Sequence, residues 1–108
     1  MVRIDANRIM DRATFHSVFA EALGFPDFYG RNMDAWIDCM THLDDPDSGL
    51  SKARVKPGEV LSLVIENAAD FKKRCPEQFA DLVECAAFVN WRRIERGQSP
   101  VLALALYA

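Results

Sequence analysis

The chain has 108 residues, of which 50% are hydrophobic, and its formal net charge at pH 7 is −3. This length suits one domain with one buried core and is too short for two, so we expect a single domain spanning residues 1–108. The net charge is mild, so the placement of the charges along the sequence says more about partners than their total. The absence of an apolar run of about twenty residues argues against a membrane protein.

The first half of the chain predicts one strand and two helices. Residues 2–5 alternate apolar and charged side chains, as a short strand does. Asp11 is a suitable cap for a following helix, and Gly24 is expected to end that helix. A second helix should begin at Asn32, whose side chain can accept hydrogen bonds from the first turn, and run to about residue 43. Its apolar side would consist of Met33, Trp36, Ile37, Met40 and Leu43.

The second half predicts a loop, two strands and two helices. Residues 44–58 contain three Asp, two Pro and two Gly, a composition typical of a loop. Residues 60–65 predict a strand covered on both faces, and residues 101–107 are almost wholly apolar and predict a last, buried strand. A short helix is expected over 67–74 and a longer one over 76–96. Strands separated by helices indicate an α/β fold in which a small three-stranded parallel sheet packs against about four helices.

Negative charge is concentrated in one segment. Between Glu21 and Asp47 there are seven acidic residues and one base, Arg31, so this segment has a net charge of −6, and the rest of the chain has +3. Such a segment suits a basic partner and would repel a phosphate backbone.

Three cysteines without close, regular spacing do not predict a disulfide framework. The chain begins without the charged and apolar regions of a secretion signal. We therefore expect a cytoplasmic protein with reduced thiols.

The predicted second helix has a polar face opposite its apolar side. Residues three and four positions apart share a helix face. Asp34 suits the first turn, where the helix dipole favours an anion, but Asp38 has no such structural reason. The face is interpreted either as a solvated surface or as a binding surface. It consists of Asp34, Asp38, Thr41, His42 and Asp45.

Tyr29 and Gly30 precede this helix and also allow two interpretations. A Tyr followed by Gly at a helix entry is commonly a packed aromatic beside a tight turn. A Tyr next to an acidic face is also a good anchor for a protein interface.

The spacings expected of enzymes and metal sites are not found. In a calcium loop beginning at Asp44, Pro46 and Ser48 would fall on ligand positions. Cys75 and Cys85 lack zinc-ligand spacing. The glycines are scattered, so no phosphate-binding loop is predicted. We therefore expect no enzymatic activity, no metal and no cofactor; a small hydrolase or metal enzyme using Asp34 and Asp38 is a weaker alternative.

The segment FYGRNMDAWIDCMT, residues 28–41, preceded by LGFP, resembles the signature of the barstar family of intracellular ribonuclease inhibitors. The resemblance implies a barstar-like fold in which the second helix and the loop before it block the active site of a small basic ribonuclease. Asp38 would be the principal mimic of an RNA phosphate, and the free protein would be a monomer. The other implied partner-binding residues are Tyr29, Gly30, Asn32, Asp34, Ile37, Thr41, His42 and, more loosely, Glu95.

The chain also departs from the family pattern. Trp36 and Ile37 stand where the family has Leu and Trp, and Leu43 replaces a second interface aromatic. Arg92 and its neighbours end the long helix where the family has carboxylates. These differences are compatible with a different ribonuclease or another basic toxin as the partner. The alternative function is a barstar-like module that regulates a partner other than a nuclease.

Overall fold

Three parallel strands form the single sheet of the computed structural model, which describes residues 1–108. They are β1 (Val2–Asp5), β2 (Leu61–Glu66) and β3 (Leu102–Leu106), in the order β1-β2-β3. In the register of the sheet, Ile65 of the central strand lies opposite Ile4 and Leu106.

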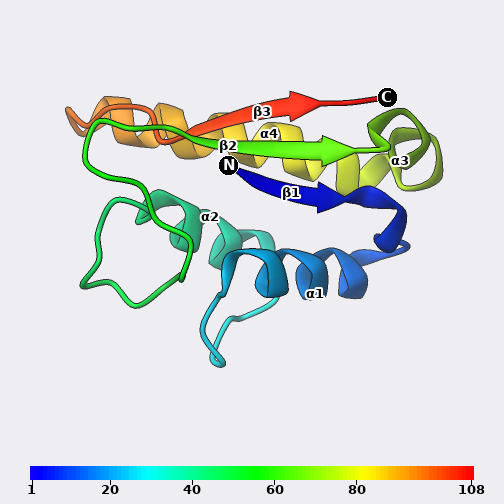
Figure 1. The fold of residues 1–108 in the computed structure, drawn as a ribbon, viewed down its shortest axis with the longest axis horizontal. Helices are drawn as coiled ribbons and strands as arrows, with labels where there is room; N and C mark the ends of the chain where they lie inside the picture. Colours follow the sequence, from blue (N-terminus) through cyan, green and yellow to red (C-terminus); the bar gives the residue numbers. More distant parts are fainter.

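Four α-helices and one 3-10 turn connect and cover these strands. The turn η1 (Ala6–Arg8) follows β1, and the helices are α1 (Arg12–Leu23), α2 (Met33–Thr41), α3 (Ala68–Arg74) and α4 (Pro76–Glu95). In Figure 1, α4 lies behind β2 and β3, whereas α1 and α2 lie below β1. None of the helices combines the length and the apolar content needed to cross a membrane. The predicted fold class, a small α/β fold with a three-stranded parallel sheet, is confirmed.

The helix boundaries arise from local side-chain chemistry. Asp11 accepts a hydrogen bond from the Thr14 amide at 2.8 Å, and the Thr14 hydroxyl accepts one from the Asp11 amide at 3.0 Å, a reciprocal capping box for α1. Gly24 ends α1 with φ = 68°, a left-handed conformation that suits glycine. Asn32 caps α2 by accepting from the Ala35 amide at 2.8 Å, as predicted.

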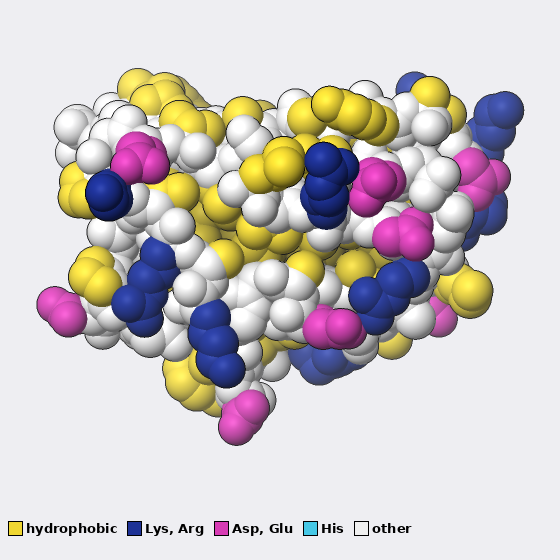
Figure 2. All heavy atoms as spheres, viewed as in Figure 1, with side chains coloured by type: hydrophobic (Ala, Val, Ile, Leu, Met, Phe, Trp, Pro, Cys, Tyr) yellow, Lys and Arg dark blue, Asp and Glu magenta, His cyan; other side chains and the backbone are white.

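Only one face of the sheet is covered by helices. Leu61, Leu63 and Ile65 alternate along β2 and are at most 4% exposed, because they point into the core. On the opposite face, Ser62 and Glu66 are partly exposed and only Val64 between them is buried, at 4% exposed, although no element lies in front of the strands in Figure 1. The expectation that β2 is covered on both faces is therefore wrong. Figure 2, seen from the same side, shows acidic and basic side chains interspersed over this face.

The expectation that the last strand is buried is also wrong in part. Leu102 is 4% exposed, but Ala103 is exposed and Leu106 is 46% exposed. The reason is that β3 is an edge strand, so an apolar sequence does not ensure burial there.

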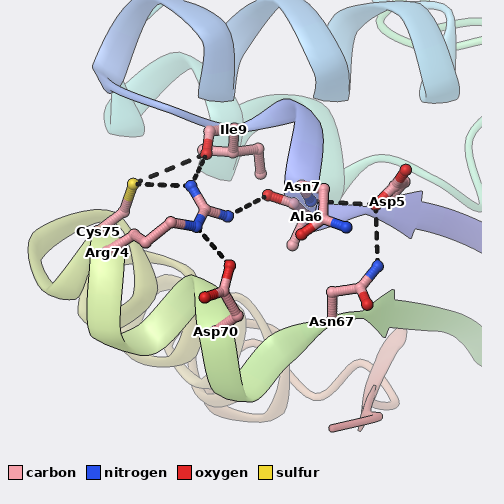
Figure 3. Close-up of polar contacts among 8 residues, drawn as sticks. All are labelled: Asp5, Ala6, Asn7, Ile9, Asn67, Asp70, Arg74 and Cys75. Atoms are coloured by element: carbon pink, nitrogen blue, oxygen red, sulfur yellow. Dashed lines mark hydrogen bonds and ion pairs between the residues drawn. The ribbon is translucent and has the colours of Figure 1, made fainter.

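Arg74 joins α3 to the first turn of the chain (Figure 3). Its guanidinium donates to the backbone carbonyls of Ile9 at 2.9 Å and Ala6 at 3.1 Å. Nearby, the Asn67 side-chain amide donates to Asp5 at 3.1 Å. These contacts fix the end of the molecule at which β1 and β2 finish.

Candidate functional site

The two aspartates of α2 stand outside the core. Trp36 and Met40 of the same helix are fully buried, so the helical period places Asp34 and Asp38 on the side facing solvent. The Asp38 side chain is 59% exposed. Both carboxylates are therefore available as hydrogen-bond acceptors for a partner.

The solvent-exposed face of α2 around these aspartates contains fewer residues than the sequence predicts. Thr41 is 3% exposed, and its hydroxyl donates to the Ile37 carbonyl at 2.6 Å. The expectation that Thr41 lies on the solvent-exposed face is therefore wrong. Ile37 is 9% exposed, and His42 is half-buried with Nδ1 2.8 Å from the Asp38 carbonyl. The physical reason is that α4 packs along α2, so α2 buries more of its circumference than one apolar stripe.

Tyr29 is a packed aromatic. Its side chain is 9% exposed, its ring centroid lies 4.7 Å from that of Phe25, and its hydroxyl lies 2.6 Å from Nδ1 of His16. Burial raises the pKa of Tyr29. Burial, together with the positive charges of Arg12 and Arg31, lowers the pKa of His16 to about 4. His16 is therefore a neutral core residue at pH 7.

Phe28, which sequence analysis did not single out, is the exposed aromatic of the connector between α1 and α2 (residues 24–32). Its side chain is 76% exposed and lines a hollow beside α2 together with Gly30 and Asp38. Phe28 lies in a turn in which the Tyr29 amide donates to the Pro26 carbonyl at 2.9 Å, and no sequence signal distinguished the exposed Phe28 from the buried Tyr29.

The connector is held in place at its end. Arg31 adopts a left-handed conformation with φ = 55°, and its guanidinium donates to the Ala13 carbonyl and the Ser17 hydroxyl, both at 2.8 Å. A Cβ atom on Gly30 would lie 3.4 Å from the Cβ of Ala35 and 3.4 Å from the Asn32 amide nitrogen, at van der Waals contact with both. Arg31, the only base of the acidic segment, is thus bound to α1.

Acidic residues of α4 extend the surface beyond α2. Asp34 lines a hollow together with Glu77 and Asp81, and Arg12 of α1 borders the same hollow. Sequence analysis missed both α4 residues, although their spacing of four places them on one helix face. The negative surface therefore includes residues from two helices that are separate in the sequence.

At the other end of the surface, a basic residue stands beside Asp38. The Arg92 guanidinium lies 3.7 Å from the Asp38 carboxylate, and its side chain is 29% exposed. Glu95, the loosely expected partner-binding residue of α4, is exposed one turn further on. The charge of Asp38 is thus partly neutralised by Arg92.

Arg93 has a structural role. It is 3% exposed, and its guanidinium donates to Asp44 at 3.0 and 2.7 Å, to the Thr41 carbonyl at 2.7 Å and to the Ser99 carbonyl at 2.8 Å. The hydrogen bonds from Arg93 lower the pKa of the Asp44 carboxyl. This ion pair joins the ends of α2 and α4, so Asp44 does not belong to the exposed acidic surface.

The cysteines are not reactive thiols, and no side chains are placed to bind a metal ion. All three cysteines are free, and burial raises the pKa of Cys39 to about 11, which keeps it a neutral thiol. No group of three His, Cys, Asp or Glu side chains is placed to hold a metal ion. The site therefore presents hydrogen-bond acceptors and one exposed aromatic side chain to a partner.

Comparison with known protein families matches residues 1–104 to the family described as barstar (barnase inhibitor). That description is of a protein inhibitor and not of a catalyst. No curated protein matches the chain significantly. Because the match covers almost the whole sequence, the chain belongs to the barstar family.

Proposed function

We propose that this protein inhibits a small basic ribonuclease by placing α2 and the connector before it in the active site of the enzyme. The carboxylates of Asp34 and Asp38 would occupy positions that RNA phosphates take. Phe28 would pack against the enzyme beside them.

The observation that carries the proposal is the position of Asp38. Its side chain is 59% exposed on the solvent-facing side of α2 and lines the same hollow as the exposed Phe28. A carboxylate beside an exposed aromatic offers both a charge for guanidinium or ammonium groups and an apolar anchor, a combination common at interface hot spots.

Glu77 and Asp81 would contribute mainly to the rate of association. Their charges lie at the side of the surface next to Asp34. Charges at the rim of an interface steer the encounter more than they stabilise the complex. Affinity should therefore weaken with salt chiefly through a slower association rate.

The test is inhibition of RNA cleavage by a panel of small basic ribonucleases, with barnase as the one named by the family. Calorimetry should give 1:1 binding to at least one of them. Asp38→Asn should lose about a hundredfold or more in affinity, the usual effect of removing one partner of a buried charge pair.

Asp47→Asn is the matched control, because Asp47 is an exposed aspartate of the loop that follows α2. It should leave inhibition unchanged. Equal inhibition by the parent and by Asp38→Asn would contradict the mechanism.

A second candidate function is regulation of a partner that is not a nuclease, recognised through the end of α4. The observation in its favour is that Trp91 and Ile94, 50% and 56% exposed, flank Arg92. Under this alternative, Arg92→Glu would abolish binding of the partner, whereas Asp38→Asn would not.

A further inference from the structure

The outer edge of β3 is an unprotected strand edge. The strand is Leu-Ala-Leu-Ala-Leu, with no charged residue and no proline. β3 is the last strand of the sheet, and no element lies beyond it in Figure 1. Edges of this kind usually carry charges, prolines or bulges that prevent pairing with another strand.

The hydrogen bonds around β3 show which backbone groups point outward. The Val101 carbonyl accepts from Leu61 at 2.8 Å, and the Tyr107 amide donates to Ile65 at 2.9 Å, so these two residues face β2. Because backbone groups alternate along a strand, the amides and carbonyls of Leu102, Leu104 and Leu106 should face away from β2.

The first of these outward positions already has a partner. The Asn90 side chain of α4 accepts from the Leu102 amide at 3.1 Å and donates to the Leu102 carbonyl at 2.9 Å. Leu104 and Leu106 receive no comparable side chain. Two amides and two carbonyls therefore remain for another strand.

We propose that this edge pairs with β3 of a second copy of the chain, antiparallel and about a two-fold axis at Ala105. Leu104 of each copy would lie opposite Leu106 of the other. Each such pair exchanges two hydrogen bonds, so four hydrogen bonds would join the two sheets.

Two features favour a second copy as the occupant. In this register Leu104 lies opposite Leu106 of the other copy and Ala105 lies opposite itself, so leucines meet leucines and no charge is left to match. Pairing would also cover Leu106 and Tyr107, which are 46% and 58% exposed. A two-fold axis at Leu104 is disfavoured, because it would require the groups of Leu102 that Asn90 occupies.

The dimer would be weak and would leave the inhibitory surface free. One pair of short strands buries less than the roughly 1,200–2,000 Å² of a stable interface. In Figure 1, β3 lies at the top of the molecule and α2 lies below β1. This inference departs from the monomer expected from the sequence, because the sequence does not show that the last strand is an edge.

Sedimentation equilibrium of the full chain, from micromolar to near-millimolar concentration, tests whether the dimer exists. The parent should associate with rising concentration, and Leu106→Lys should remain a monomer. Val60→Lys is the matched control, because Val60 is 47% exposed against 46% for Leu106 and lies outside β3. A parent that is monomeric throughout, or equal effects of the two lysine variants, would overturn the proposal.

Cysteine cross-linking tests the register in variants that also carry Cys85→Ser. Ala105 faces its own copy across a pair with Cα atoms about 4.5 Å apart, within the range of a disulfide. The two Ala103 residues would lie about 14 Å apart, too far for a bridge. Mild oxidation should therefore link Ala105→Cys dimers and not Ala103→Cys dimers; no link, or equal linking of both, would refute this register.

Discussion

Acidification should destabilise this protein through His16. The imidazole is 2% exposed, and its Nδ1 lies 2.6 Å from the Tyr29 hydroxyl. Burial, together with the nearby charges of Arg12 and Arg31, lowers its pKa from 6.5 to about 4, and Asp81 opposes this lowering. The folded protein therefore keeps His16 neutral over a pH range in which the unfolded chain binds a proton.

The size of the effect follows from these two values. Because the folded pKa is below the unfolded one, the stabilising contribution is complete above pH 6.5 and is lost as the pH falls toward about 4. The difference between these two pKa values corresponds to about 3 kcal/mol of stability once both states are fully protonated. Between about pH 7.5 and about pH 5, the free energy of unfolding should fall by about 2 kcal/mol.

Urea denaturation at these two pH values measures the effect. The parent should lose stability on acidification, and His16→Gln should lose much less, because it has no group that titrates in this range. His42→Gln is the control, since His42 is the other histidine of the chain and is only half-buried. The explanation fails if His16→Gln and the parent show the same pH dependence.

Three further predictions concern the elements that hold the site. Asp44→Asn should lower the free energy of unfolding by about 2–4 kcal/mol in urea denaturation, because the buried charge of Arg93 would lose its carboxylate partner. The control Asp45→Asn, at an exposed position, should have little effect on the free energy of unfolding. Asn32→Ala should cost about 1 kcal/mol in the same assay through loss of the α2 cap, and an unchanged midpoint would contradict that role. Phe28→Ala should leave the unfolding midpoint unchanged and weaken ribonuclease binding by about tenfold or more in calorimetry, as expected of an aromatic anchor; unchanged affinity would exclude Phe28 from the interface.

The order of the elements could be predicted because short-range chemistry determines it. Asp11 and Asn32 cap the helices that they were expected to cap, and Gly24 ends the first of them. Pro76 begins the long helix, as expected of a residue without a backbone amide hydrogen. These signals are local, so they do not depend on which elements later become neighbours.

Exposure was harder to predict because it depends on neighbours distant in the sequence. Thr41 was placed on the exposed face by periodicity, but the packing of α4 against α2 buries it. Trp36 stands where the family has Leu, and because it is fully buried, this difference changes the packing of the core and not the exposed surface. Glu77 and Asp81 belong to the acidic surface because α4 lies next to the first turn of α2, a contact that the sequence does not reveal.

The contacts of Arg74 bear on the order in which the chain can fold during synthesis. Its hydrogen bonds reach back to Ile9 and Ala6, 65 and 68 residues earlier, and β1 pairs only with β2. The first strand therefore has no hydrogen-bonding partner strand until most of the protein has left the ribosome. Contacts of such long sequence separation slow folding. We expect α1 and α2 to meet before the N-terminal strand docks, so the surface assigned to ribonuclease binding would begin to assemble before the sheet that supports it is complete.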